Sequence, residues 1–440
     1  MRKRSLARRI LVSIAVVVAA CVLGALAVFL GAFESSVVDT SLEPLVTGDG
    51  HATPARPMSD DEIAALAPRG RYLAAAADCT ACHTAPGGAP WAGGRAFEMP
   101  FGTLYATNIS PDPTYGIGGW SRADFHRALR DGVGKGGRHL YPAMPYVSYR
   151  NLTAADVDAL YAFLMTQAPM AVPNREDSFP FPYVRRFMTF WNLINLPRTV
   201  AADDRSKTPA WNRGRYLVDA LGHCGECHTP RDLTMGMIRD RYLEGARIEG
   251  VDAPDITPAG LGRLGFSEEG LARFLPTGLG PQGVVSFSMY DVVHHSTRYL
   301  TGDDVAAMAA YLVDGALPVA TTPVPIAADV AASGRQRYVE LCSACHGLAG
   351  EGIPHVAPAM ATNADLRLPD ARNLLVAVVD GLPARAFPGR ERMQAMPAFA
   401  DLLADGEIAD LANYLRATWG GTAPDVTADA VSEIRRAERP

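Results

Sequence analysis

The sequence carries one five-residue pattern three times, as CTACH at residues 79–83, CGECH at 224–228 and CSACH at 342–346. In each copy, two cysteines are separated by two residues and followed at once by a histidine. The copies use six of the seven cysteines, and the seventh, Cys21, lies in an apolar stretch near the N-terminus. A repeated C-x-x-C-H pattern is typical of the covalent attachment of c-type haem.

The chemistry of haem attachment explains why these residue types have this spacing. Two thiols add to the two vinyl groups of one haem, and the adjacent histidine then lies beneath the iron as its proximal ligand. We therefore predict three covalently bound c-type haems. The predicted attachment residues are Cys79, Cys82, Cys224, Cys227, Cys342 and Cys345, and the predicted proximal ligands are His83, His228 and His346.

Other uses of paired cysteines fit this sequence less well. A thioredoxin-type C-x-x-C would need a βαβ context and would not need a histidine beside it three times. A structural zinc site needs four ligands in paired knuckles, whereas these pairs lie more than a hundred residues apart. A disulfide across two intervening residues would crosslink almost nothing.

The motifs belong to a larger repeat. A Gly-Arg pair, beginning at Gly70, Gly214 or Gly334, precedes each motif and predicts a helix that runs into the cysteines. Each unit closes with an amphipathic stretch, at 152–164, 300–312 and 403–415, and Thr153 and Thr301 are N-cap candidates. Between these helices the first two units align, with residues 108–111 matching 255–258 and residues 120–121 matching 266–267.

These repeats predict a mainly α-helical chain, with three tandem class I-like cytochrome c domains after one N-terminal transmembrane helix. We expect unit one at 60–170, unit two at 208–318 and unit three at 328–420. Residues 1–35 would form a basic tail with a membrane anchor or signal, 171–207 a linker and 421–440 a tail. The region 165–212 combines prolines with a dense aromatic run. This region is either a strap that packs units one and two together, or a docking surface for a catalytic subunit or a quinone.

An uncharged stretch of 24 residues, 10–33, is long enough to span a bilayer of about 30 Å. A cleavable signal would have a shorter apolar region, and a lipoprotein signal would have a polar tether after Cys21. We therefore favour an uncleaved anchor over these two alternatives. The preceding basic tail would stay in the cytoplasm, which places the haem domains on the periplasmic side of the inner membrane.

Methionines at matching positions are candidates for the sixth iron ligand. Met144 and Met289 each lie 61 residues after the histidine of their own motif, and Met396, which precedes a proline, lies 50 residues after the third. Competing residues are Met99, Met360, Met393, His139, His294 and His295. A methionine taken at random is more often core filler. Three Met-ligated irons would be coordinatively closed, so they would pass electrons and would not bind substrate.

The charge distribution excludes a nucleic-acid partner. The chain has a net charge of -6, but five positive charges fall within the first nine residues, and removing them leaves -11. An acidic body lacks the main driving force for binding phosphates. With 48% hydrophobic and 20% charged residues, the chain is also a poor candidate for disorder.

Together with the haem motifs, residues 105–112, 116–120, 139–146 and 222–230 resemble the triheme cytochrome c subunit of bacterial membrane-bound alcohol, aldehyde and sugar-acid dehydrogenases. The resemblance covers about residues 60–420. It implies that electrons come from a quinoprotein, flavoprotein or molybdoprotein catalytic subunit and go to ubiquinone or a terminal oxidase. The sequence departs from the resemblance at Asp255 and Phe266, where Asn and Trp are typical.

The motifs leave three function classes open. The favoured class is an electron-transfer subunit that is not an enzyme on its own, since the chain has no dinucleotide fingerprint, P-loop or nucleophile elbow. A haem enzyme with one open iron would require that Met289 is not a ligand. A cytochrome module of a respiratory oxidase or reductase complex would carry electrons from a different partner.

Overall fold

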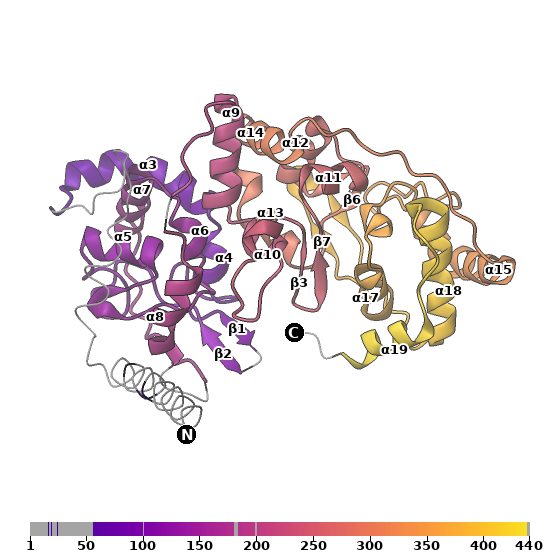
Figure 1. Cartoon of the computed structure of the whole chain (residues 1–440), viewed down its shortest axis with the longest axis horizontal. Coiled ribbons are helices and arrows are strands. Elements are labelled where there is room, and N and C mark those ends of the chain that lie inside the picture. The colour runs from indigo at the N-terminus through magenta and orange to yellow at the C-terminus, as the bar shows by residue number, and fades with distance from the viewer. Residues whose placement is uncertain are drawn as a thin grey trace, which may run out of the picture.

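In each unit, the helix that precedes the C-x-x-C-H motif packs against the helix that closes the unit. The computed structural model describes residues 16, 19, 24, 56–99, 101–179, 184–198 and 200–437. The packed pairs are α3 (Asp60–Ala76) with α7 (Ala154–Met165), α9 (Pro209–Arg215) with α14 (Gly302–Val313), and α15 (Ala328–Arg337) with α18 (Asp405–Leu415). The predicted opening and closing helices are therefore confirmed. Figure 1 shows unit one at one end of the molecule, unit three at the other and unit two between them.

One glycine in each opening helix permits this packing. A Cβ atom on Gly70, Gly214 or Gly334 would lie 1.8, 1.9 or 2.4 Å from a backbone oxygen of the closing helix. Those distances are far inside van der Waals contact, so only glycine lets the two backbones approach this closely. The Gly-Arg pairs in the sequence therefore mark the helix crossings.

The remaining elements are short and lie between the paired helices. Unit one contains α4 (Cys79–His83), β1 (Ala96–Met99), β2 (Gly102–Tyr105), α5 (Arg122–Asp131), η1 (Lys135–Gly137) and α6 (Tyr146–Tyr149). Unit two contains η2 (Tyr216–Leu221), α10 (Gly225–His228), η3 (Arg239–Arg241), β3 (Ala246–Ile248), β4 (Val251–Ala253), α11 (Pro258–Leu264), α12 (Glu268–Thr277), β5 (Leu279–Gly280), β6 (Gly283–Val284), α13 (Ser288–His295) and η4 (Thr297–Tyr299). Unit three contains η5 (Tyr338–Cys342), α16 (Ser343–His346), η6 (Ala364–Arg367), α17 (Arg372–Asp380), β7 (Arg385–Ala386), η7 (Pro388–Arg390), β8 (Arg392–Met393) and η8 (Arg416–Gly420). The strands pair only as two-stranded antiparallel hairpins, β1-β2, β3-β4, β5-β6 and β7-β8, so the described chain is mainly helical.

Units one and two share one apolar core, whereas unit three has its own. The shared core contains Leu73 and Leu152 from unit one together with Leu217 and Leu312 from unit two. The core of unit three includes Tyr338, Leu374, Ile408 and Leu411. The buried residues of the packed helices are mainly apolar, such as Val157 and Leu160 of α7 and Ile408 and Leu411 of α18. The repeat therefore folds as a fused pair plus one attached unit.

Reciprocal hydrogen bonds join units one and two. The Tyr72 hydroxyl donates to Asp304 of unit two at 2.5 Å, and the Tyr216 hydroxyl donates to Asp156 of unit one at 2.6 Å. The two tyrosines hold the same place in the repeat, two residues after the crossing glycine, and the two carboxylates lie three residues after the N-cap threonines. The exchange is what an approximate two-fold axis between the units produces.

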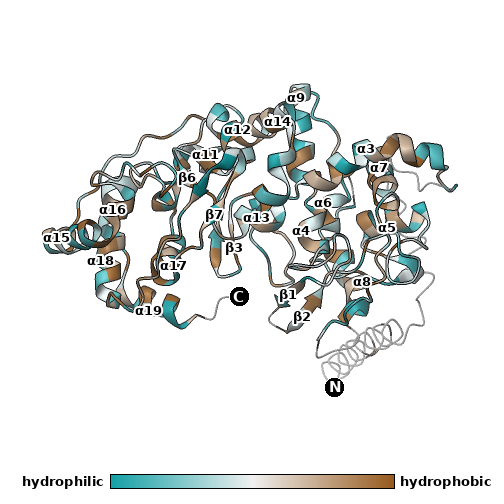
Figure 2. Ribbon diagram, turned by 180° about the vertical axis from the view of Figure 1, so that it is seen from behind, coloured by the Kyte–Doolittle hydropathy of each residue, from teal (hydrophilic) through white to brown (hydrophobic). Residues whose placement is uncertain are grey.

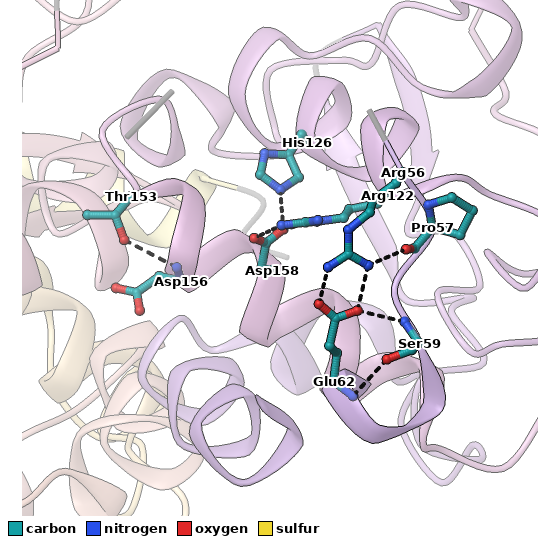
Figure 3. A network of polar contacts seen from close by, with 9 residues as sticks. All are labelled: Arg56, Pro57, Ser59, Glu62, Arg122, His126, Thr153, Asp156 and Asp158. Atoms are coloured by element: carbon teal, nitrogen blue, oxygen red, sulfur yellow. Dashed lines mark hydrogen bonds and ion pairs between the residues drawn. The ribbon is translucent and has the colours of Figure 1, made fainter. Parts of the chain in front are cut away.

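Polar contacts fix the closing helix of unit one (Figure 3). Asp158 accepts hydrogen bonds from Arg122 and from Nε2 of the buried His126, the latter at 2.8 Å. Burial alone would raise the pKa of Asp158, but these hydrogen bonds outweigh it and lower the pKa. Thr153 caps the helix by accepting from the Asp156 amide, as predicted, and Thr301 caps α14 in the same way.

The two segments expected to lie outside the units both contain helices. In the 171–207 linker, α8 (Val184–Asn195) packs its buried Met188 and Asn192 inward. In the expected 421–440 tail, α19 (Ala428–Arg436) packs against unit three through Val431 and Ile434. The apolar residues Val431 and Ile434 lie three positions apart on one face of α19, which explains why this helix folds onto unit three. The inward face of α8 is mixed, because it contains both Met188 and Asn192.

The predicted membrane anchor, residues 10–33, lies outside the described residues apart from Val16, Ala19 and Gly24. Within the part of the chain that is described, no helix is both long and apolar enough to cross a bilayer.

The helix crossings give a direct stability test. We expect Gly214→Ala to lower the free energy of unfolding by about 1–3 kcal/mol, because the new Cβ overlaps the backbone of α14. Gly302→Ala, on α14 itself, is the matched control, since a Cβ there meets no atom within 4 Å. Guanidinium unfolding of the haem-loaded chain measures both variants. Equal stability of the two variants would contradict the role assigned to the crossing glycine.

Candidate haem-binding sites

Each histidine of the three motifs forms the same hydrogen bond. The Nδ1 atoms of His83, His228 and His346 lie 2.7, 2.7 and 2.9 Å from the backbone carbonyl oxygens of Thr107, Pro254 and Pro358. Because a carbonyl oxygen only accepts, Nδ1 carries the proton and Nε2 keeps its lone pair for a metal. Burial lowers the pKa of all three imidazoles, although this hydrogen bond opposes the shift, so the neutral, metal-binding form is favoured.

The carbonyl that orients the imidazole lies on equivalent turns in units one and two. The residue after this carbonyl is Asn108 in unit one and Asp255 in unit two. Its side chain accepts a hydrogen bond of 2.9 Å from the backbone amide of Ser110 or Thr257, respectively. The remaining amide nitrogen of Asn108 donates to Met170 at 2.8 Å, whereas the second carboxylate oxygen of Asp255 accepts from Arg263 at 2.6 Å. The presence of Asp255, where the family typically has Asn, therefore leaves the turn and its carbonyl in place.

Phe266, where the family typically has Trp, occupies the position that corresponds to Trp120 of unit one. Phe266 is buried and packs edge-on against Phe274, with ring centroids 5.0 Å apart. An aromatic ring is thus retained in the shared core at this position.

The six motif cysteines form no disulfide with one another. Burial raises the pKa of the unmodified Cys79 and Cys224 thiols to about 12, and that of the Cys82, Cys227 and Cys342 thiols to about 11. Cys345 differs from the others because it is exposed. Among the described residues, no three His, Cys, Asp or Glu side chains gather as a metal-ion site.

Unit three contains a cavity of about 530 Å³ whose lining fits a c-type haem. Cys342, Cys345 and His346 contribute to its wall, and Leu366, Val378, Phe399, Leu411 and Leu415 are among its apolar lining residues. Two thiols, one imidazole and thioether sulfurs around an apolar space match the attachment and ligation chemistry of this cofactor. The structure therefore brings the predicted residues of the third motif to one cavity.

Three methionines reach this cavity, and their surroundings differ. Met396 packs with Cys342 against the core of unit three, and its backbone pairs with Leu382 through two hydrogen bonds of 2.9 Å. Met393 lies in β8 and packs against a separate cluster that includes Val285 and Phe387. Met360 is buried in the core of unit three. Of the two neighbours in sequence, Met396 is the one that shares a cluster with the haem-attachment cysteine.

The other two candidate methionines occupy equivalent positions. The Leu140 amide donates to the Gly132 carbonyl at 2.7 Å, and the Val285 amide donates to the Gly278 carbonyl at 2.9 Å. Met144 and Met289 each follow four residues after those amides, so the equal spacing in sequence reflects equal backbone register. Their surroundings differ, because Met144 packs on the core shared by units one and two, and Met289 packs on the cluster next to unit three.

The competing histidines have other contacts. His139 Nε2 lies 3.0 Å from the Thr189 hydroxyl of α8. His294 stacks on Tyr290, with ring centroids 5.6 Å apart, and His295 packs edge-on against His294 at 4.8 Å. Met99 lies at the end of β1 in a hairpin.

The motifs of units one and two face each other. Asp78 and His223, which directly precede the first cysteines, both have left-handed backbones, with φ of 54° and 41°. Tyr149 of unit one packs edge-on against His223 at 5.6 Å, and its hydroxyl donates to the Ala77 carbonyl at 2.9 Å. Burial and then the charge of Asp291 in unit two raise the pKa of Asp78 to about 8. No sequence pattern indicates these residues, because only the approach of the two units gives them partners.

Unit three meets unit two on the side of the candidate distal loop. The Tyr290 hydroxyl donates to the Ala386 carbonyl at 2.8 Å, and residues 284–288 line the cavity of unit three. Within that segment Phe287 has a positive φ of 52° and packs against the core of unit three. A non-glycine residue in this conformation is strained, and here the packing between units holds it.

Comparisons with known proteins indicate the family of the chain. The model of the Cytochrome c family matches residues 67–168 and 331–419. The gluconate 2-dehydrogenase cytochrome c subunit of Pantoea cypripedii is 39% identical over 87% of this chain and 92% of that protein. The cytochrome c subunit of the quinone alcohol dehydrogenase of Gluconobacter oxydans is 36% identical over 87% of this chain and 84% of that protein.

One of the nicotinate dehydrogenase subunits of Pseudomonas putida is 42% identical over 82% of this chain, but the chain spans only 31% of that protein. The match to the two relatives of similar length is sufficient to show the family of the chain. The chain is a c-type cytochrome and belongs to the cytochrome c subunits of dehydrogenases. It transfers electrons and does not oxidise substrate itself, which confirms the resemblance and argues against a haem enzyme.

The placement of the methionines in unit three leads to a test. We expect Met396→Ala to let carbon monoxide bind one reduced haem and to lower the potential of that haem, because a thioether ligand raises the potential. Met393→Ala is the matched control and should change neither property. Absorption spectra and redox titration of the intact chain measure both. The reverse pattern would assign the ligand to Met393.

Proposed function

We propose that this chain is a triheme cytochrome that relays electrons from a catalytic dehydrogenase subunit to ubiquinone or a terminal oxidase. The observation that carries the proposal is the hydrogen bond that each of the three motif histidines makes to a backbone carbonyl, since it prepares Nε2 for iron in all three units. The proposed axial pairs are His83 with Met144, His228 with Met289, and His346 with Met396.

The haems supply one-electron redox chemistry, and the chain sets how that chemistry runs. Two cysteines would hold each ring, the backbone carbonyl sets the tautomer of the histidine that would bind the iron, and the methionine would keep substrate from the iron. Apolar walls around the rings exclude water and tune the potential. Each of these roles belongs to a side chain that the repeat places by position.

The contacts between units support a linear relay with unit two in the middle. Unit one meets unit two through the facing motifs, and unit three meets unit two through residues 284–288. The residues beside the two motifs support this contact, because Tyr149 packs edge-on against His223 at 5.6 Å and its hydroxyl donates to the Ala77 carbonyl at 2.9 Å.

The names of the relatives support a partner that oxidises gluconate, an alcohol or a similar substrate. The sequence resemblance implies that its catalytic subunit would be a quinoprotein, a flavoprotein or a molybdoprotein. We place the docking surface at unit three, where Cys345 is exposed and the exposed apolar residues Val339, Leu348 and Ile353 lie near it in sequence. Residues 10–33 would anchor the chain in the inner membrane, with the haem units on the periplasmic side.

Leu348 tests this docking surface. Its side chain is 73% exposed, so Leu348→Glu should leave the fold intact. We expect the substitution to slow electron transfer from the catalytic partner to the haems by about tenfold, because a carboxylate replaces an apolar contact of the complex. Stopped-flow absorbance measures the rate, and reduction by dithionite shows that the haems are intact.

Leu317→Glu is the matched control, since Leu317 is 80% exposed and lies at the end of unit two, just after α14. This variant should be reduced at the wild-type rate. A wild-type rate for Leu348→Glu would remove unit three as the docking site.

A further inference from the structure

The helix α8 presents two different faces. Its buried residues, Met188 and Asn192, point inward, and Asn192 accepts a hydrogen bond of 2.7 Å from the Tyr146 hydroxyl. The exposed residues are large and apolar: Phe187 (49%), Phe190 (38%), Leu193 (49%) and Ile194 (68%). This helix buries a polar asparagine and exposes aromatic and aliphatic side chains. Such an exposed apolar face is typical of a surface that binds a partner or a membrane.

A turn of unit two extends this apolar face. The turn, residues 231–237, is closed by pairing of Arg231 with Met237, and it is fixed to α8 because the Trp191 indole donates to the Thr234 carbonyl at 2.8 Å. At its tip, Leu233 is fully exposed and Met235 is 63% exposed. We call the outer face of α8 and the tip of this turn the α8 surface.

The α8 surface lies beside the candidate distal loop of unit one. Thr189 and Asn192 of α8 contact His139 and Tyr146, which flank Met144 in the sequence. Figure 1 shows α8 at the edge of the molecule, next to unit one and far from unit three, and Figure 2 shows that it carries both apolar and polar residues. Whatever covers the α8 surface therefore comes close to the first haem unit, at the opposite end from the docking surface proposed on unit three.

We propose that the α8 surface sits on a lipid bilayer and inserts its apolar side chains into the boundary between headgroups and acyl chains. The proposal rests on the membrane anchoring proposed above. Residues 34–55 join the uncharged stretch to the first described domain and can extend to about 75 Å, so the tether allows unit one to reach the bilayer.

The composition of the outer face and the shape of the turn favour lipid over a protein partner. The helix contains no acidic residue, and Arg185 near its start is paired with Asp177 at 2.5 Å, which leaves aromatic and aliphatic side chains as the exposed part of α8. An exposed aromatic and aliphatic helix face is typical of helices that lie at the boundary of a bilayer. The turn tip protrudes, since Leu233 is fully exposed, whereas a protein interface centres its main anchors in packed pockets.

Site-specific photo-crosslinking tests the proposal in the intact, haem-loaded chain. The photoreactive residue p-benzoylphenylalanine replaces Ile194, Leu233 or, as a control, Leu317, and each chain is reconstituted into vesicles of phosphatidylethanolamine and phosphatidylglycerol. We expect phospholipid adducts at 194 and 233 several-fold above those at 317, measured by mass spectrometry. Equal adducts at all three positions would overturn the proposal.

A second arm uses the complex with the catalytic subunit in the same vesicles. Lipid adducts at 233 that persist in the complex support the bilayer, whereas a protein crosslink to the catalytic subunit at 233 would overturn it and assign the surface to that partner. The haem spectrum of each variant is recorded in parallel. Loss of haem reduction by the partner would contradict the proposed electron relay. The lipid adducts are measured independently of haem reduction, so they would still test whether the α8 surface contacts the bilayer.

Discussion

The structure depends on how closely two helices cross in each unit. The crossing glycine brings the opening and closing helices to backbone contact, and the opening helix then delivers the C-x-x-C-H motif eight to ten residues later. With the motif fixed, the histidine meets the carbonyl that sets its tautomer. A side chain at the crossing would separate the helices and disturb this geometry.

The same repeat produces two different interfaces. In units one and two, the tyrosine that follows the crossing glycine reaches a carboxylate of the other unit, so the exchange of Tyr72 and Tyr216 fuses the two cores. In unit three the residue two after the crossing glycine is Gln336, and Tyr338, which lies two residues further on, donates to the Gly347 carbonyl of its own unit at 2.5 Å. Unit three therefore attaches elsewhere, through the strained Phe287 and the neighbouring segment of unit two. This difference creates an order of units that suits a relay.

Much of this architecture could be predicted from the sequence, because it depends on local patterns. The haem motifs, the opening and closing helices and the caps at Thr153 and Thr301 follow from spacing, periodicity and capping chemistry. The equal spacing of Met144 and Met289 likewise reflects equal backbone register. Such features need only a short stretch of chain.

Other features could not be predicted, because they arise between distant segments. Asp78 and His223 gain partners only when units one and two come together. The aromatic run of the linker is visible in the sequence, but which of its residues face outward depends on how α8 packs. Likewise, α19 falls in a segment predicted as a tail, because the surface that buries it belongs to other helices.

The central claim is that the chain holds three haems whose irons are all closed by methionine. The most direct measurement is a pyridine haemochrome count on the intact purified chain, followed by the spectrum of the reduced form with carbon monoxide. We predict three haems per chain and no shift with carbon monoxide. Fewer than three haems, or a carbon monoxide adduct on any of them, would contradict it.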